Sequence, residues 1–321
     1  MALKKQMEEW ALRLKPLHWG YNLLNRKRIL SDRATFRRYG IHRPRWFSLS
    51  ASTFTDKSDR EWWPEVTESQ MSSVTDARVQ NLVGRYSDEI RSWTKEGYLV
   101  LPGLLSGESL EIVNEEINRL LQKEEVGFNR QGNKIMFALR KSEAVRKVID
   151  ESGLDPLMDL LMGKETALFQ SINFLRGSEQ GTHSDSIHMS TYPRGGLIAA
   201  WIALEDVSEE NGPLHYYPGS HKLPYIDNID FGNEGNVLML GGKPYAAYTK
   251  VVNERIDQAG LEKKIFTPKK GDVFIWHANL LHGGEPIGDP NSTRKSMVLH
   301  YFSPDHICYH EISQRPALKM L

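Results

Sequence analysis

Two histidines and an aspartate are the residues of this chain best suited to binding a metal ion. His183 and Asp185 are two positions apart, so in an extended segment their side chains point the same way. Two histidines and one carboxylate on one face of an ion form the facial triad of non-haem Fe(II) oxygenases. We expect His282 as the third ligand, because a late strand there gives way to a Gly-rich turn, with His277 as the alternative. A solvated turn is the other interpretation of the triplet, since the chain has 11 histidines.

An arginine downstream of His282 has the chemistry to hold an acidic cosubstrate. Arg294 lies on the way into the last predicted core strand, and Ser296 follows two positions later, so both can face the interior of the fold. An arginine fork pairs with a carboxylate through two parallel hydrogen bonds. A buried arginine near the metal would therefore suit a dicarboxylate such as 2-oxoglutarate, whereas a surface ion pair is the alternative.

The elements that must position these residues change character along the chain. Helices are expected first: one through Trp93 that ends at Gly97, one from Ser106, and one over 144–149. The strand 98–101 lies between the first two. After residue 165 the spacing becomes that of strands, which are short and bounded by Gly, Pro, Asn or Ser. The predicted strands cover 167–175, 197–204, 214–217, 273–277 and 297–302.

This order of elements predicts an α+β fold. The lack of regular helices between the later strands argues against βαβ units and favours a sandwich or jelly roll, the group that includes cupins. We expect a double-stranded β-helix domain over 86–321, preceded by an N-terminal extension over 1–85 in which 69–73 forms a linker. The Gly-rich segment near 224–264 is too long for a hairpin and predicts a lid-like insertion.

Composition indicates a soluble globular protein. The chain has 321 residues, 40% of them hydrophobic, which suffices for a sizeable core. Neither a membrane span nor a signal peptide is evident, so a cytoplasmic location is expected. The single cysteine, Cys308, excludes an internal disulfide framework and Cys-rich metal sites.

The N-terminal segment differs in charge from the rest of the chain. Residues 1–50 carry 12 Lys and Arg against three acidic residues, a net charge of about +9, while the whole chain has a formal net charge of zero. The extension also contains Trp10, Trp19, Trp46, Trp62 and Trp63. Three interpretations remain open: an extension packed on the barrel, a segment for peripheral membrane or protein contact, or an arm for nucleic acid. The tryptophans favour the first two, so nucleic acid is not the expected partner.

The residues from Ile90 to Pro304 resemble the phytanoyl-CoA dioxygenase family of Fe(II)/2-oxoglutarate oxygenases, which includes ectoine hydroxylase. The motifs that carry the resemblance are Gly97–Gly103, His183–Asp185, Trp201–Leu204 with Asn211–Leu214, Pro218–His221, and His282–Gly283 followed by Arg294.

The resemblance implies a set of site residues and cofactors. It implies Fe(II) on His183, Asp185 and His282, and 2-oxoglutarate and O2 as cosubstrates. Related halogenases have a small residue at the position of the aspartate, so Asp185 favours hydroxylation or desaturation. Matching positions imply contacts to 2-oxoglutarate from Arg294 at its distal carboxylate, from Ser296, from Gln170 and Asn173, and from Trp201, which otherwise packs the barrel interior.

Other residues near the triad receive weaker expectations. Six histidines are interpreted as structural groups, although the first of them can also line the pocket: His188, His215, His221, His300, His306 and His310. Tyr192, Arg194, Phe137 and Arg140 are hypothesised to face substrate.

The favoured function is an oxygenase that hydroxylates an unactivated C–H bond of a small molecule, lipid or biosynthetic intermediate. The alternatives are a cupin-like metal-dependent ligand-binding protein without redox turnover and an interaction protein on a degenerate barrel. Arg294 discriminates between them, because a binding module has no need of a 2-oxoglutarate anchor.

Overall fold

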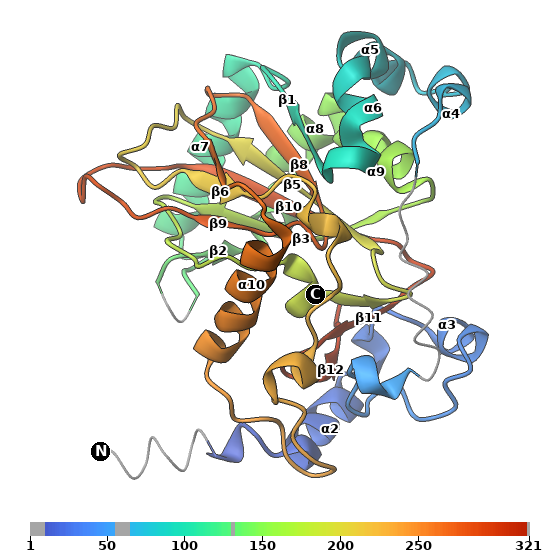
Figure 1. Cartoon of the computed structure of the whole chain (residues 1–321). Coiled ribbons are helices and arrows are strands. Elements are labelled where there is room, and N and C mark those ends of the chain that lie inside the picture. Colours follow the sequence, from blue (N-terminus) through green and yellow to red (C-terminus); the bar gives the residue numbers. More distant parts are fainter. Residues whose placement is uncertain (1–9, 55–64, 130–131, 320–321) are drawn as a thin grey trace.

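The computed structural model in Figure 1 describes residues 10–54, 65–129 and 132–319. Trp62 and Trp63 lie outside these ranges. A large sheet runs through the upper half of the molecule in the view of Figure 1, with helices on its outer side. The C-terminal strands and the N-terminal helices lie below it in this view.

The large sheet is antiparallel and joins strands that are far apart in sequence. Its order is β1-β8-β5-β10-β3-β2, so a late strand lies between two early ones, as the crossing connections of a jelly roll require. All five predicted strands of the β region form within one or two residues of their expected ends. The strands of this sheet are β1 Tyr98–Leu101, β2 Ile135–Met136, β3 Ala167–Phe174, β5 Leu197–Ala203, β8 Val273–His277 and β10 Ser296–Phe302.

Two three-stranded sheets complete the β structure. One has the order β7-β6-β9, the other β12-β11-β4. Side chains of β6 and β7 pack against the inner faces of β5, β8 and β10, which makes the two-layered interior of a double-stranded β-helix. The strands are β4 Ser190–Tyr192, β6 Leu214–Tyr216, β7 Lys264–Phe266, β9 His282–Gly284, β11 Ile307–His310 and β12 Arg315–Pro316.

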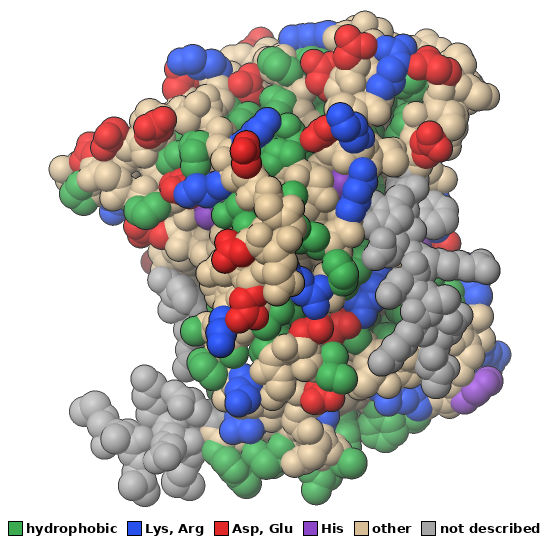
Figure 2. Space-filling view, viewed as in Figure 1, with side chains coloured by type: hydrophobic (Ala, Val, Ile, Leu, Met, Phe, Trp, Pro, Cys, Tyr) green, Lys and Arg blue, Asp and Glu red, His purple; other side chains and the backbone are tan. Residues whose placement is uncertain are grey.

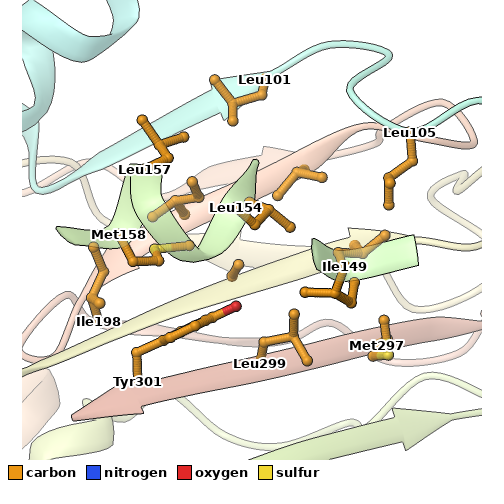
Figure 3. Packing of buried hydrophobic residues seen from close by; sticks show 14 of the residues in the cluster. Leu101, Leu105, Ile149, Leu154, Leu157, Met158, Ile198, Met297, Leu299 and Tyr301 are labelled. Atoms are coloured by element: carbon orange, nitrogen blue, oxygen red, sulfur yellow. The ribbon is translucent and has the colours of Figure 1, made fainter. Parts of the chain in front are cut away.

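Helices cover the outer face of the large sheet. In Figure 3, Leu154, Leu157 and Met158 of one helix lie over Ile198 and Tyr301 of the sheet. The three expected helices are confirmed, and a fourth follows the third because Gly153, in the left-handed conformation, separates the two. These helices are α5 Ala77–Arg85, α6 Ser87–Glu96, α7 Gly107–Gln122, α8 Glu143–Ser152 and α9 Leu154–Met162.

The segment expected to be a linker is helical instead. Helix α4 spans Glu68–Ser72, and Thr67 and Gln70 form a capping box in which each side chain accepts from the other's backbone N–H. Met71 is buried in the main core. The expectation for 69–73 was therefore wrong: a polar composition hid a Thr-x-x-Gln helix start.

The insertion after Pro224 is also folded. Helix α10, Tyr245–Ala259, buries a stripe of Tyr248, Val252 and Ile256 against Ile187 and Leu281 of the barrel. Whether this insertion moves as a lid stays a prediction. Short 3-10 turns occur at Arg26–Arg28, Ala51–Thr53, Ala138–Lys141, Asp185–Ile187, Ser220–Lys222 and Asn228–Phe231.

The N-terminal extension packs at two places. Residues 10–54, with helices α2 Lys15–Leu24 and α3 Arg33–Arg38, lie against the C-terminal strands, where Leu49 N–H donates to Gln314 O at 2.8 Å. Residues from Val66 onward join the main core under the large sheet. The main core thus includes residues on both sides of the expected boundary, and the division of the chain into 1–85 and 86–321 stays a prediction. Among the described residues, no helix has the length and apolar character needed to cross a membrane.

Candidate metal centre and cosubstrate cavity

His183, Asp185 and His282 converge at the mouth of the barrel. The backbones of His183 and His282 pair, each N–H donating to the other's carbonyl at 2.9 Å, which sets the two rings side by side. Asp185 Oδ1 lies 3.8 Å from Nε2 of each histidine. One donor atom from each residue falls within 4.8 Å of the others, and all three residues are buried. The three groups can therefore hold one ion.

Backbone carbonyls orient both imidazoles. His183 Nδ1 lies 2.9 Å from Gly181 O, and His282 Nδ1 lies 3.0 Å from Leu280 O. Because a carbonyl can only accept, Nδ1 of each ring carries the proton, and the lone pair is on Nε2, the atom that faces Asp185. The side-chain amide of Gln180 donates to His183 Nε2 at 3.0 Å, which agrees with that assignment. Burial also lowers the pKa of His183, so the ring is neutral, as a metal ligand must be.

The second oxygen of Asp185 is held by two groups that sequence reasoning did not place here. Trp276 Nε1 donates to Oδ2 at 2.8 Å, and His300 Nε2 lies 3.5 Å from the same atom. Burial by itself would raise the pKa of Asp185, but the interactions with His282 and His300 outweigh it and hold this pKa below its usual range. Oδ1 is thus left as the charged oxygen that faces the two histidines.

A cavity of about 570 Å³ opens beside the triad, between the inner face of the large sheet and the smaller sheet. Its described lining contains one carboxylate, Asp185, and two cations, Lys134 and Arg294. The cavity therefore carries an excess of positive charge and suits an anionic ligand.

Arg294 lies deep in this cavity and is 2% exposed. One nitrogen, Nη1, donates to Gly212 O at 2.9 Å, while Nε has no hydrogen-bond partner among the described residues. Its guanidinium lies between the rings of Phe174 and Trp201, 5.7 and 5.6 Å from their centroids. Burial lowers the pKa of Arg294 to about 10. A buried guanidinium with an unused donor is what a carboxylate ligand would complete.

The structure brings most of the expected cosubstrate residues to this cavity but not Asn173. Gln170 and Trp201 line it, and Ser296, opposite Phe174 on the neighbouring strand, points to the same side with an unpartnered hydroxyl. Asn173 lies opposite Met297, which packs under the helices. Adjacent residues of a strand face opposite sides, so the placement of Asn173 does not support the predicted contact.

Lys134 and Gln180 were missed because neither belongs to a recognisable motif. Lys134 Nζ donates to Gln180 Oε1 at 3.0 Å, and the Gln180 amide reaches His183 as described above. Burial lowers the pKa of Lys134. His300 was interpreted as structural, although the alternation Ser296, Val298, His300 along β10 could have placed it inside the barrel.

The outer wall of the cavity comes partly from the insertion. Tyr245, at the start of α10, stacks on His188 with 5.7 Å between ring centroids, and its hydroxyl lies 3.2 Å from His188 Nε2. His310 packs edge-on against His188. His188, Tyr245 and His310 all line the cavity, and their rings give this wall an aromatic character.

Other predicted residues lie elsewhere. His277 points away from the triad and accepts from Asn279 N–H through Nδ1 at 3.1 Å, so it is not the third member of the cluster. Tyr192 and Arg194 line a separate cavity with Phe54 and Asp227, and Arg140 lines a shallow hollow on the helical side. The structure therefore does not place Tyr192, Arg194 or Arg140 around the metal cavity; Phe137 is likewise outside its described lining.

Comparison with known proteins identifies the same family as the sequence motifs. The model of a family described as phytanoyl-CoA dioxygenase matches residues 93–295. A phytanoyl-CoA dioxygenase domain-containing protein 1 of Danio rerio is 23% identical over 256 residues, which cover 60% of this chain and 82% of the relative. An ectoine dioxygenase of Halomonas elongata is 26% identical over 240 residues, 68% of this chain and 70% of the relative.

Solved structures share the fold. The α-ketoglutarate-dependent epimerase SnoN from nogalamycin biosynthesis matches with a TM-score of 0.53 and 22% identity, over 68% of this chain and 84% of that one. EctD from S. alaskensis, solved with 2-oxoglutarate and 5-hydroxyectoine, matches with a TM-score of 0.53 and 19% identity, over 72% and 78% of the two chains. The double-stranded β-helix expected from the strand pattern is thereby confirmed.

Proposed function

Because this chain belongs to the phytanoyl-CoA dioxygenase family and is a non-haem Fe(II)- and 2-oxoglutarate-dependent oxygenase, we propose that it hydroxylates a C–H bond of a small organic molecule. The observation that carries the proposal is the convergence of His183, Asp185 and His282 beside a cavity whose described lining has two cations and one carboxylate. When bound, iron with 2-oxoglutarate and O2 supplies the oxidising chemistry, and the protein supplies position and charge.

The three residues fit a divalent iron. Two neutral imidazole nitrogens and one carboxylate oxygen suit a first-row metal that must keep positions open. The backbone bonds of the histidines and the Trp276 bond of Asp185 fix the ligands in orientation before the ion arrives. Asp185 fills the position at which a halogenase would need space, so the proposal is hydroxylation rather than halogenation.

Arg294 is proposed to hold the distal carboxylate of 2-oxoglutarate. Its unpartnered Nε and the unpartnered hydroxyl of Ser296 are both buried, and a carboxylate can accept from both kinds of donor. Lys134 adds a second positive charge on the same cavity, which favours a dianion over a neutral ligand. Gln170 and Trp201 contribute to the walls.

The substrate is proposed to be a compact small molecule. A cavity of about 570 Å³ has room for one beside the cosubstrate but not for a polymer chain. Relatives are named for ectoine, and a structural neighbour for a nogalamycin pathway, both small molecules. The wall of Tyr245 and His188 is proposed to contact the substrate, because these rings border the cavity on the side of the insertion.

The test is an anaerobic titration of metal-free protein with Fe(II) and 2-oxoglutarate, followed by the weak visible charge-transfer band of the iron chelate. The band is expected in the wild type and lost in His183→Ala. His310→Ala is the matched control, since this histidine also lines the cavity but lies outside the triad. Succinate formation under O2 then measures turnover.

Either of two outcomes would contradict the proposal. Absence of the band in a folded wild-type protein would argue against the site. A band without any succinate formation would favour the alternative, a metal-dependent binding protein without redox turnover.

A further inference from the structure

Helix α2 presents an apolar face to solvent. Leu17, Tyr21 and Leu24 follow one another at spacings of four and three residues and so share one side of the helix. All three are exposed, Leu24 to 84%. An isolated exposed leucine is ordinary, but a row of them on one helix face marks a surface that contacts something.

The fully buried residues of α2 are polar. Its buried residues are Lys15 and Asn22, and Asn22 donates to Trp46 O at 3.2 Å. The amine of Lys15 donates to Asn236 O at 2.6 Å. Trp19 also packs edge-on against Phe47, with 5.0 Å between ring centroids. The helix is thus attached through Lys15, Asn22 and Trp19, while Leu17, Tyr21 and Leu24 face outward.

The apolar surface extends beyond the helix. Trp10 and Leu12 precede it, and Val237 and Leu238 of the insertion lie beside it, tied by the bond from Lys15 N–H to Leu238 O at 2.9 Å. Val237 is 80% exposed. Figure 2 shows hydrophobic side chains gathered at the lower end of the molecule, where Figure 1 places α2. We name these residues the apolar tip: Trp10, Leu12, Leu17, Tyr21, Leu24, Val237 and Leu238.

The chain around the apolar tip is strongly basic. Residues 10–50 contain ten Lys and Arg and one acidic residue, Asp32. Arg26 and Lys27 follow α2 directly and are exposed. The tip therefore combines aliphatic side chains, two amphipathic rings and adjacent positive charge, the composition of segments that lie in the interface of an anionic bilayer.

We propose that the apolar tip docks on an anionic lipid surface, with the aliphatic side chains below the headgroups and Arg26 and Lys27 at the phosphates. A second copy of the chain is the less suitable occupant. A two-fold interface over the tip would bring the positive charges of one copy close to those of the other. Lipid phosphates neutralise the same charges.

The apolar tip and the cavity are connected through the insertion. Val237 and Leu238 belong to the insertion that continues into α10, and Tyr245 at the start of α10 borders the cavity. Leu238 of the apolar tip and Tyr245 of the cavity wall are thus only seven positions apart in the chain. This proposal does not depend on the oxygenase reaction and is tested without it.

The test is partition of the full-length protein onto vesicles, measured by sedimentation. We expect binding to mixed phosphatidylcholine and phosphatidylglycerol vesicles, weaker binding to pure phosphatidylcholine, and a decrease at high salt. Leu17→Gln with Leu24→Gln should lower the partition coefficient by about tenfold or more, because two exposed leucines no longer enter the bilayer. Ile112→Gln, on an exposed position of α7, is the matched control and should bind as the wild type.

The contribution of charge is tested separately. Arg26→Gln with Lys27→Gln should remove the preference for phosphatidylglycerol, whereas Lys95→Gln with Lys123→Gln, on other helix ends, should not. Equal binding by the Leu17/Leu24 variant and the wild type would overturn the proposal. A concentration-dependent dimer that this variant abolishes, without vesicle binding by the wild type, would assign the tip to self-association instead. A wild-type protein that neither binds vesicles nor forms a dimer would also refute the proposal.

Discussion

Replacing Arg294 with methionine should abolish tight binding of 2-oxoglutarate without weakening the fold. The two effects separate because the buried guanidinium has no carboxylate among the described lining residues except Asp185, which the histidines and Trp276 already hold. The uncompensated charge of Arg294 destabilises the ligand-free fold, and binding of a carboxylate ligand would offset this destabilisation. The lowered pKa of Arg294 has the same cause, since burial disfavours its charged form.

The expected magnitudes follow from this environment. Truncating one partner of a buried charge pair costs about 2–5 kcal/mol, so the dissociation constant for 2-oxoglutarate should rise by about 30-fold to about 5,000-fold. Exchanging a buried ion pair for apolar side chains of similar volume is often neutral or stabilising by about 1–4 kcal/mol, and we expect the same direction for a buried guanidinium that has no carboxylate partner. Loss of the bond to Gly212 O offsets about 1 kcal/mol of that. The melting temperature of the ligand-free variant should therefore be unchanged or a few degrees higher.

The assay is thermal unfolding with and without 2-oxoglutarate, combined with the anaerobic iron titration. Arg194→Met is the matched control, because Arg194 is also largely buried but pairs with Asp227 through two bonds in the separate cavity. That variant should lose about 1–3 kcal/mol of stability, since the partly buried Asp227 carboxylate loses two hydrogen bonds, and should bind 2-oxoglutarate like the wild type. An Arg294→Met protein that is several degrees less stable yet retains wild-type affinity for 2-oxoglutarate would refute the reasoning.

Three further predictions follow from single contacts. Trp276→Phe removes the donor to Asp185 Oδ2 and should weaken Fe(II) binding about 10- to 100-fold in an iron titration. An unaltered affinity for Fe(II) would argue against a role of Trp276 in positioning Asp185. Gly97→Ala should lower the free energy of urea unfolding by about 1–3 kcal/mol more than Gly219→Ala. Both glycines have φ of +76°, but only at Gly97 would the new Cβ meet the His221 ring, at 2.2 Å. Equal losses in the two variants would contradict this steric argument. Burial lowers the pKa of His221 to about 4, so its contribution to stability is present above pH 6.5 and is lost as pH falls from about 6.5 to about 4; unfolding free energies across that range should fall more steeply in wild type than in His221→Asn.

Local patterns were enough to predict most of the fold. The strands and the helices under the large sheet have clear periodicity, because each has one face in a core and the periods of 2 and 3.6 are visible within the element itself. Helix α4 was missed although its Thr67–Gln70 capping box is also local. Helix α10 was missed because three buried residues among fifteen leave only a thin apolar stripe.

The triad was predictable for a similar reason. His183 and Asp185 are neighbours on one extended segment, and His282 follows a strand with a recognisable turn, so spacing and residue type pointed to one ion. The amino-acid sequence also determined the excess of positive charge in residues 1–50. It did not determine that α2 turns its apolar face outward, because that depends on Asn22 and Lys15 finding partners at Trp46 and Asn236.

The groups around the triad were decided by the tertiary structure alone. Trp276 and His300 reach Asp185 from strands 91 and 115 positions further along the chain. Lys134, which lines the same cavity, comes from an earlier part of the chain. Asn173 shares a strand with the cavity-lining Phe174 yet faces the helices. Which side chains meet depends on strand order and on register across the sheet, and a shift of one residue exchanges the two faces. Spacing within one segment shows which residues share a face, as it does for Ser296, Val298 and His300, but not which residues of another strand they meet.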